Sequence, residues 1–373
     1  MQTIKFLHKV AIIVPSYLLI FAIVAYIALD IEFLQNLYIR HIILALLLLY
    51  ATSHLIRALT FFFGRWVVAH TSRNFSPERQ FNRYRECQQI SHCSGEKRQH
   101  IVLLLHGFTT SPMDWKILAA RLSAEKIDFH APLISGFGQV NQDSILSIHK
   151  EDWFRQIVDT YDLFAERYEK ISVIGHSMGG MLACYLAQLR PVHELIISAP
   201  ALFPQKQQGF YARVVRNRFA TNLVSWQIPM IPKPSRSGRS GPADTMDSKA
   251  TYHYFQYLVA PVRLLFAMLQ AQMEIKLDEM SYQRFTLLYG AHDITVDNPV
   301  IEKFISSINL PFQRFRFTNS AHNIFVDFDH EQANDLVITL LTDTFSKQDQ
   351  QKYDYRHYPP AASKGASKCQ QKQ

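Results

Sequence analysis

Ser177 is the residue of this sequence that is best placed to act as a nucleophile. It lies in the run Gly-His-Ser-Met-Gly at 175–179, after an apolar run at 170–174 that predicts a strand and before a helical pattern at 181–189. A strand that turns sharply into a helix presents a serine at its apex, and glycines are needed beside it because a Cβ there would clash. The pattern therefore predicts a serine that forms a covalent intermediate with its substrate.

A serine hydroxyl needs a base that removes its proton, and the base needs a carboxylate that orients it. Asp293 follows a predicted strand, and His322 lies in a loop before the last predicted helix. The chain order Ser, Asp, His is the one that goes with this type of turn on a parallel sheet. We predict that Asp293 orients His322, which takes the proton of Ser177. His292 and Asp297 are neighbouring alternatives, although Asp297 fits better as the cap of the following helix.

Two main-chain N–H groups are predicted to stabilise the negative oxygen of the tetrahedral intermediate. Met178 follows the nucleophile at the start of a helix, where N–H groups have no partner within the helix. Phe108 lies in the loop after His106 and Gly107, at the end of the apolar run 101–105. We expect the N–H groups of Phe108 and Met178 to form the oxyanion hole, each contributing about 3 kcal/mol. The ring of Phe108 can pack in the core at the same time.

Short apolar runs that alternate with amphipathic stretches must position these residues. Strands are predicted at 101–105, 129–133, 170–174, 194–198, 284–289 and 313–317, and helices at 153–168 and 181–189. This alternation favours an α/β fold with a doubly wound, mostly parallel sheet. The candidate residues follow the carboxyl ends of strands, which is where such sheets form their sites.

The motifs resemble the α/β-hydrolase superfamily, and among its members bacterial carboxylesterases and monoacylglycerol lipases. The residues that carry the resemblance are Leu104-Leu105-His106-Gly107-Phe108-Thr109, His130-Ala131-Pro132-Leu133, the Gly136-x-Gly138 turn, Asp152-Trp153, Gly175-His176-Ser177-Met178-Gly179-Gly180, His292-Asp293 and Ala321-His322. The resemblance covers about residues 99 to 347. It implies an α/β-hydrolase fold and ester hydrolysis with no metal and no organic cofactor.

The predicted hydrolase core comprises residues 99–200 and 282–347, and residues 201–281 form an insertion between them. In the superfamily this position holds a cap over the active site. The insertion contains a Ser-, Gly- and Arg-rich stretch between Pro232 and Pro242, which predicts a loop. Apolar helical stretches follow between Tyr252 and Leu269. They are either the core of the cap or a wall that binds an acyl chain.

Residues 1–66 are predicted to anchor the chain in a membrane through two transmembrane helices. Val10–Leu29 carries no charge and has the length needed to cross the hydrocarbon core. Ile42–Phe63 is the second candidate, although Ser53, His54 and Arg57 in its second half weaken the prediction. A cleaved signal peptide is the alternative for the first run, but its length and the missing cleavage site argue against it.

The charges around these runs predict the topology. Lysines flank the first run and arginines follow the second, whereas the loop at 30–41 carries a single arginine and two acidic residues. The positive-inside rule then places both ends and the catalytic domain in the cytoplasm, as part of a multi-pass membrane protein that contacts the lipid bilayer. Residues 67–98 form a basic linker, which either touches anionic lipid headgroups or is simply solvated. The net charge of +8 permits nucleic-acid binding, but no recognition motif supports it.

The four cysteines are scattered, which is typical of a reducing compartment and not of a disulfide scaffold. Cys87, His92 and Cys93 lie close in sequence, but no second pair at zinc-site spacing accompanies them, so no metal site is predicted. Residues 348–373 are rich in Gln, Lys and Ser and are predicted to be disordered.

Together these features predict a membrane-anchored serine hydrolase that cleaves a small acyl ester, such as a monoacylglycerol or a lysophospholipid. A thioesterase or an aminopeptidase with the same triad is an alternative within the enzyme class. An aminopeptidase would need an acidic group in the cap, and Asp244, Asp247 and Glu274 do not obviously converge in the sequence. A membrane scaffold that keeps the fold without catalysis is the alternative outside it, and an intact triad argues against that reading.

Overall fold

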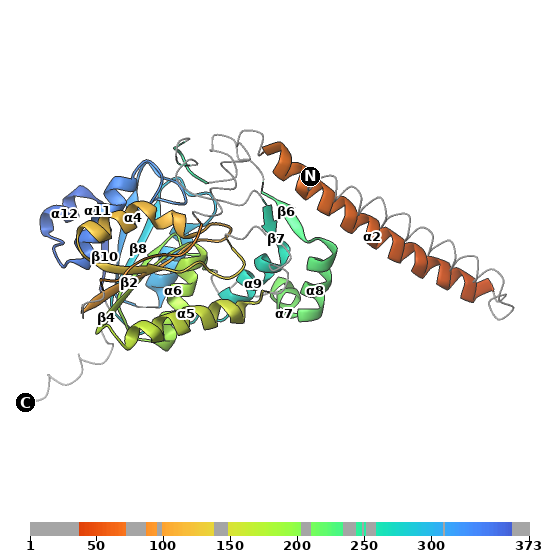
Figure 1. Cartoon of the computed structure of the whole chain (residues 1–373), viewed down its shortest axis with the longest axis horizontal. Coiled ribbons are helices and arrows are strands. Elements are labelled where there is room, and N and C mark those ends of the chain that lie inside the picture. The colour runs from red at the N-terminus through yellow and green to blue at the C-terminus, as the bar shows by residue number, and fades with distance from the viewer. Residues whose placement is uncertain are drawn as a thin grey trace, which may run out of the picture.

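The computed structural model shows one α/β domain with a long helix projecting from it (Figure 1). The residues that the structure describes are 37–71, 87–94, 99–137, 148–202, 210–233, 244–247, 250, 259–308 and 310–359. The first predicted membrane segment, Val10–Leu29, lies outside these ranges.

An eight-stranded sheet with the order β1-β3-β2-β4-β5-β8-β9-β10 forms the centre of the domain. Its inner strands run parallel to one another, whereas β1 and β10 pair antiparallel at the two edges. The strands are β1 (Ile90–His92), β2 (His100–Leu105), β3 (Asp128–Ala131), β4 (Lys170–His176), β5 (Val192–Ser198), β8 (Tyr282–Gly290), β9 (Phe312–Phe317) and β10 (Asp354–Tyr358). The predicted mostly parallel sheet is confirmed.

Helices cover both faces of the sheet because alternate side chains of each inner strand point to opposite faces. On β2, Leu103 and Leu105 pack towards α5 and α6, whereas Val102 and Leu104 pack towards α4 and α11. All four side chains are buried, so β2 is apolar throughout, as expected for a strand covered on both sides. The helices of the two layers are α5 (Lys150–Ala165), α6 (Met178–Leu189) and α10 (Asn298–Ser307) on one face, and α4 (Lys116–Ala124) and α11 (His330–Leu341) on the other.

The insertion between β5 and β8 folds into a cap of short elements. They are α7 (Phe210–Arg216), α8 (Arg218–Gln227), β6 (Met230–Pro232), β7 (Val259–Pro261), α9 (Val262–Gln272) and the 3-10 helix η7 (Leu277–Glu279). Strands β6 and β7 pair with each other and not with the central sheet. A further 3-10 helix, η3 (Pro112–Trp115), follows β2.

Two boundary predictions are wrong at the edges of the sheet. The described part of the predicted disordered tail, residues 348–359, contains most of α12 (Lys347–Lys352) and all of β10. Strand β10 joins the sheet because Tyr355 and Tyr358 pack against Phe315 and Phe312 of β9. The predicted linker 67–98 contributes the edge strand β1. A composition rich in Gln and Lys concealed the aromatic residues of the tail that bind it to the sheet.

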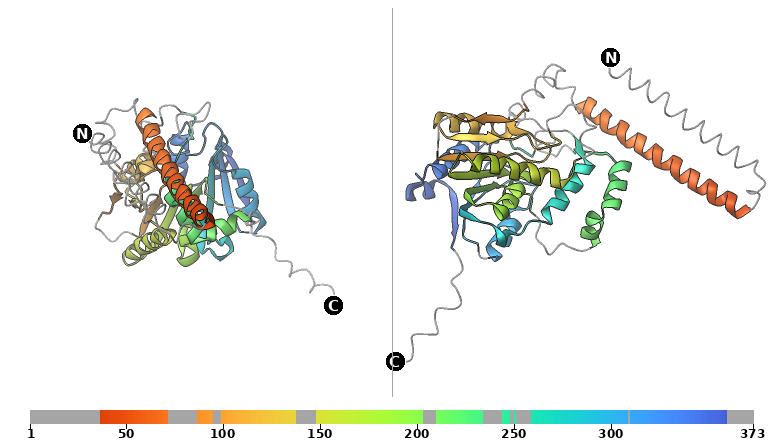
Figure 2. Two further views of the ribbon diagram at one scale, coloured as in Figure 1. Left: turned by 90° about the vertical axis from the view of Figure 1, so that its right-hand side faces the viewer. Right: turned by 60° about the horizontal axis from the view of Figure 1, so that its bottom comes forward.

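Helix α2 (Leu37–Thr71) contains the second predicted membrane segment and extends well beyond the domain (Figure 2). None of the helices in the described ranges combines the length and the hydropathy required to cross a bilayer. The prediction of a membrane-spanning helix over Ile42–Phe63 is therefore not supported by this structure.

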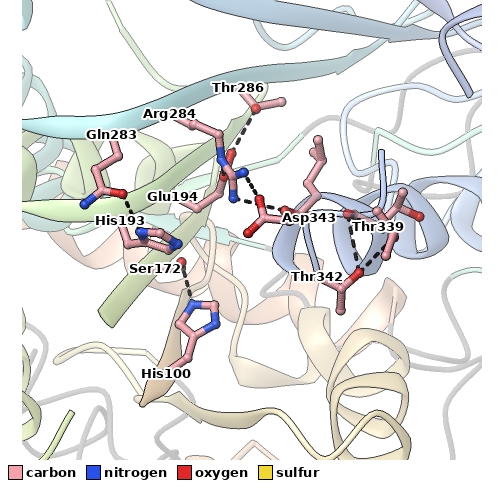
Figure 3. A network of polar contacts seen from close by, with 12 residues as sticks. His100, Ser172, His193, Glu194, Gln283, Arg284, Thr286, Thr339, Thr342 and Asp343 are labelled. Atoms are coloured by element: carbon pink, nitrogen blue, oxygen red, sulfur yellow. Dashed lines mark hydrogen bonds and ion pairs between the residues drawn. The ribbon is translucent and has the colours of Figure 1, made fainter. Parts of the chain in front are cut away.

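The amino ends of the parallel strands carry a network of polar side chains (Figure 3). Ser177, by contrast, follows the carboxyl end of β4. His100 Nε2 lies 2.8 Å from Ser172 Oγ. Arg284 pairs with the buried Glu194 and with Asp343. These contacts join β2 to β4, β5 to β8 and β8 to the end of α11. They hold the sheet together at the amino ends of its strands, whereas the candidate site lies at the carboxyl ends.

Candidate active site

Ser177 lies at the turn between β4 and α6 with φ 53° and ψ −114°. A positive φ is costly for a residue with a side chain, and such strain is characteristic of functional turns. Gly179 permits the turn, because a Cβ on this residue would lie 1.9 Å from the carbonyl oxygen of Leu105 on the neighbouring strand. The close approach of α6 to β2 thus fixes Ser177 at the carboxyl edge of the sheet.

The structure brings Ser177, His322 and Asp293 into one hydrogen-bonded chain. His322 Nε2 lies 3.0 Å from Ser177 Oγ, and His322 Nδ1 lies 2.9 Å from Asp293 Oδ2. Asp293 follows β8 and His322 follows β9, so the order of the strands in the sheet places the acid and base loops side by side. The side chain of Asp293 is almost wholly buried and that of His322 is mostly buried.

Donors from one short loop hold the carboxylate of Asp293 in place. Its Oδ1 accepts hydrogen bonds from the N–H groups of Thr295 and Val296, at 2.8 and 3.0 Å. Its Oδ2 accepts a third from Asn298 Nδ2, at 2.6 Å. With both oxygens engaged, the carboxylate keeps one orientation towards His322.

The charges of the pair favour an ionised aspartate beside a basic histidine. Burial alone would raise the pKa of Asp293, but His322 and the main-chain donors lower it below its ordinary value. Burial alone would lower the pKa of His322, but Asp293 and, to a smaller extent, Asp244 raise it above its ordinary value. This is the electrostatic arrangement that lets a histidine accept a proton from a serine hydroxyl.

His106 supports the loop that contains Phe108. Its Nδ1–H donates to the carbonyl oxygen of Gly107 at 2.9 Å, and its Nε2 accepts a hydrogen bond from the N–H of Ile134 at 3.0 Å. Burial lowers the pKa of His106 to about 4, so the ring stays neutral and can make both bonds. A Cβ on Gly107 would lie 3.5 Å from Ser177 Cβ, which shows how closely this loop packs on the nucleophile.

Met178 is buried at the first position of α6, directly after Ser177. The first N–H groups of a helix have no acceptor within it, and the helix dipole favours negative charge there. Phe108 and Met178 thus flank Ser177 from the ends of two adjacent strands, β2 and β4. The role of these two N–H groups as an oxyanion hole stays a prediction.

Asp114 is a buried carboxylate behind the same loop that the sequence did not single out. Its Oδ2 accepts hydrogen bonds from Thr110 Oγ1 at 2.6 Å and from the N–H of Gly107 at 3.4 Å. Burial raises the pKa of Asp114 to about 7, because these donors and the nearby cations offset only part of the desolvation. Asp114 therefore joins η3 to the loop that contains Gly107 and Phe108, which we call the oxyanion loop after its predicted role, and its charge depends on pH near neutrality.

Asp244 connects the cap to the acid and base loops. Its main-chain oxygen accepts the N–H of His322 at 3.0 Å. Its carboxylate Oδ2 accepts the N–H of Ile294 at 3.0 Å and the hydroxyl of Thr295 at 2.8 Å. The sequence left Asp244 without a role, because its partners are some fifty and eighty residues further along the chain.

The segment 244–247 is held to the histidine loop by a second buried carboxylate, Asp327. Asp327 accepts hydrogen bonds from the N–H groups of Met246 and Asp247 of the cap and from that of Ala321, next to His322. Two carboxylates, Asp244 and Asp327, therefore fasten this part of the cap to the loop that carries the base.

The alternative residues have other surroundings. Asp297 caps α10, as predicted, by accepting the N–H of Val300 at 3.2 Å. His292 is exposed to solvent beside Asp293. Cys87 is buried against Met113, and His92 stacks on Phe129. Within the described ranges, no group of His, Cys, Asp and Glu side chains is arranged to hold a metal ion.

Comparison with known proteins gives a family match and two partial sequence matches. A family model described as serine aminopeptidase, S33 (Hydrolase_4) matches residues 96–329, which is more than half of the chain. The chain is 30% identical over 115 residues to a carboxylesterase of Bacillus subtilis (strain 168), covering 31% of this chain and 46% of the relative. It is 33% identical over 90 residues to a thermostable monoacylglycerol lipase of Bacillus sp. (strain H-257), covering 24% of this chain and 36% of the relative. The chain thus spans less than half the length of these curated relatives.

Solved structures share the architecture over a wider range. The chain superposes with a TM-score of 0.57 and 19% identity on a structure described with LipS and LipT, two metagenome-derived lipolytic enzymes, covering 69% of this chain and 98% of that one. For the monoacylglycerol lipase of Paleococcus ferrophilus the TM-score is 0.53 at 17% identity, with coverage of 69% and 98%. At these identities the likeness shows the fold. The predicted α/β-hydrolase superfamily and fold are confirmed.

Proposed function

The chain belongs to the family described as serine aminopeptidase, S33, and on this premise we propose that it hydrolyses carboxylic esters through an acyl-serine intermediate. The observation that carries the proposal is the hydrogen-bonded chain from Asp293 through His322 to Ser177, at 2.9 and 3.0 Å. The raised pKa of His322 suits a general base in that chain.

In the proposed first step, Ser177 Oγ attacks the ester carbonyl carbon and gives its proton to His322 Nε2. The N–H groups of Phe108 and Met178 stabilise the negative oxygen of the tetrahedral intermediate. The intermediate collapses when His322 passes the proton to the leaving alcohol oxygen, which leaves the acyl group on Ser177. Water then attacks the acyl carbon, its proton goes to His322, and the second collapse releases the carboxylic acid as Ser177 Oγ takes the proton back.

The proposed substrate is a lipid-derived ester such as a monoacylglycerol. The printed names of the relatives, a carboxylesterase and a monoacylglycerol lipase, support the ester class. The cap helix α9 provides the evidence for an acyl-chain substrate. Leu264 on this helix lies against the loop at Gly136, and Leu265 and Met268 are only partly buried. Burial of an acyl chain against such a wall contributes about 0.8 kcal/mol per methylene.

The proposal also includes attachment to a membrane through residues 1–66, with the catalytic domain on the cytoplasmic side. The charge asymmetry around the two apolar runs supports it. A protein attached in this way stays in the membrane fraction after a carbonate wash, and protease added outside spheroplasts spares its catalytic domain. Release by carbonate would rule out the anchor, and digestion of the domain would reverse the topology.

The experiment for the enzyme activity combines a covalent probe with a chain-length series. A fluorophosphonate should label the wild-type protein and not Ser177→Ala, and kcat/KM for p-nitrophenyl esters should rise with acyl length and then level off. Met268→Trp should move the optimum to shorter chains. Labelling that persists in Ser177→Ala would refute the nucleophile. Activity confined to acetyl and butyryl esters would refute the lipid substrate but keep the esterase.

Cleavage of an amide next to a free amino group is a second candidate function, favoured by one observation. Asp244 is a buried acidic residue of the cap that lies near His322, and an acidic group there could bind a substrate ammonium. Its Oδ2 already accepts two hydrogen bonds from the acid loop, which favours a positioning role over a binding role. Turnover of aminoacyl p-nitroanilides at rates comparable to those of esters would support the peptidase, and its absence would leave the esterase.

A further inference from the structure

Helix α8 of the cap buries polar side chains and exposes large apolar ones, which is the reverse of a usual amphipathic surface helix. Its buried residues are Thr221 and Ser225, whose hydroxyls donate to main-chain oxygens of the same helix. Its large apolar side chains point outwards, with Phe219 77% and Leu223 53% exposed. A helix on the surface of a domain in water normally buries the apolar side chains and exposes the polar ones.

Helix α2 has the same reversed arrangement and lies directly against α8. Ser53 exchanges hydrogen bonds with Gln227 at the end of α8, and the guanidinium of Arg57 lies 4.9 Å from the ring centre of Trp226. The polar residues that weakened the sequence prediction thus face the cap. Among the side chains of α2 that the structure describes, the large exposed apolar ones are Ile42, Leu44, Leu46, Leu48, Leu49, Tyr50, Leu55, Ile56 and Leu59.

Single exposed apolar residues are normal on a protein surface, but a contiguous apolar surface marks a contact with a partner or a membrane. Here the exposed apolar side chains lie on two helices that contact each other through Ser53 and Arg57 of α2 and the end of α8, and Figures 1 and 2 show α2 leaving the domain next to the cap. We call the outward apolar side chains of these two helices the α2–α8 face.

Basic residues at one end of the α2–α8 face indicate which partner it fits. Arg213 and Arg216 are exposed at the end of α7, and Arg218 precedes Phe219 at the start of α8. Arginines next to exposed aromatic and aliphatic residues are typical of helices at the level of anionic lipid headgroups. A two-fold dimer through this face would instead bring the arginines of both copies into one interface.

We propose that the α2–α8 face lies against a lipid bilayer with anionic headgroups, and that α8 sits at the headgroup level. The inference deepens the membrane attachment proposed above and rests on that part of it. It adds that the cap itself contacts lipid. Lys233, six residues after α8, donates to Thr109 of the oxyanion loop at 2.6 Å, so the lipid-contacting helix and the candidate active site are only a short strand apart.

The test uses the full chain in vesicles of phosphatidylcholine and phosphatidylglycerol. A cysteine at position 223 carries an environment-sensitive fluorophore, on a background with Cys93→Ser and Cys369→Ser, because the remaining Cys87 and Cys184 are buried. The matched control is Leu163→Cys on α5, since Leu163 and Leu223 are both 53% exposed. We expect nitroxide-bearing lipids to lower the emission from position 223 by about twofold or more and to leave position 163 unchanged.

Equal quenching, or none, at the two positions would overturn the proposal. Emission at position 223 that depends on protein concentration but not on nitroxide lipid would also overturn it, and would identify a second copy of the chain as the partner. Arg213→Glu with Arg216→Glu should reduce the quenching in the anionic vesicles, and no reduction would refute the role of the arginines. Ester turnover and the carbonate wash are measured on the same variants, so that failure of the lipid contact is distinguished from failure of the esterase or of the anchor.

Discussion

The central sheet holds a hydrogen-bonded serine–histidine pair at each of its two ends. At the carboxyl end, Ser177 Oγ lies 3.0 Å from His322 Nε2. At the amino end, Ser172 Oγ lies 2.8 Å from His100 Nε2 (Figure 3). By distance alone, the second pair is as good a candidate as the first.

The two histidines have opposite electrostatic surroundings. The pKa of His322 is raised, because Asp293 and Asp244 outweigh the effect of burial. The pKa of His100 is lowered to about 4, because burial is reinforced by His193, Lys170 and Arg284. A histidine among cations cannot stabilise the positive charge that it gains as a base. The comparison shows that the carboxylate, and not the serine–histidine distance, distinguishes a candidate catalytic pair from a structural one.

The largest expected effect comes from removing each serine in turn. Ser177→Ala should lower kcat by about 10⁶-fold, because the covalent route is lost. Ser172→Ala should leave kcat unchanged and lower the free energy of unfolding by about 1 kcal/mol, because half-buried His100 loses a hydrogen-bond partner. Ester turnover and thermal unfolding measure the two effects. A large loss of turnover in a folded Ser172→Ala protein would break the distinction between the two ends.

The next largest loss of turnover is expected when the carboxylate of Asp293 is replaced. Asp293→Asn should lower kcat by about 10⁴-fold in a folded protein, because an amide no longer fixes the tautomer of His322. Asp297→Asn is the matched control in the same loop, and it should cost at most about 1 kcal/mol of stability through the cap of α10 while turnover persists. If Asp297→Asn is the more damaging variant, the acid is wrongly assigned.

A smaller loss of turnover is expected when Asp114, the buried carboxylate that accepts hydrogen bonds from Gly107 and Thr110, is replaced. Asp114→Ala should lower kcat by about 10- to 100-fold, because the oxyanion loop loses a tie through Gly107 and Thr110. Asp114→Asn should retain most of the activity, because an asparagine oxygen can accept the same hydrogen bonds. Equal loss in both variants would mean that the negative charge, and not the tie, matters.

The charge of Asp114 also predicts how stability depends on pH. Its pKa is raised from 3.8 to about 7 in the folded protein, so the folded state binds a proton that the unfolded chain has already released. The contribution of this group to stability is therefore fully present below pH 3.8 and is lost as the pH rises towards 7. Chemical denaturation over this range should show a smaller fall for Asp114→Asn than for the wild-type protein.

Local signals made the sheet predictable from the sequence, and with it the close arrangement of Ser177, His322 and Asp293. The turn around Ser177 and the apolar strands before Phe108 and Asp293 are contiguous patterns, and the chain order of the fold supplied His322. Contacts between distant segments were not predictable in this way. Asp244 acquires its partners only when the cap folds back onto the loops after β8 and β9. The polar residues in the second half of α2 weakened the sequence prediction of a transmembrane helix, and only the structure shows that they contact α8.

The smallest expected effect concerns Asp244 and the pH dependence of the base. In the described part of the chain, the charged or titratable groups around His322 include Asp293, Asp244, Asp114, Lys233 and His176, and the ring centre of His176 lies 4.8 Å from that of His322. Asp244→Asn removes one negative charge but keeps an oxygen that can accept from Ile294 and Thr295, and the main-chain bond to His322 is unaffected. The protonated form of His322 then loses part of its stabilisation, so its pKa falls. Because the neutral form is the base, the acidic limb of the kcat/KM profile should move to lower pH, with kcat at the plateau largely retained.

Asp247→Asn, in the same segment, should leave the limb in place. A limb that moves to higher pH, or that moves equally in both variants, would show that Asp244 acts on His322 through the structure of the cap and not through its charge.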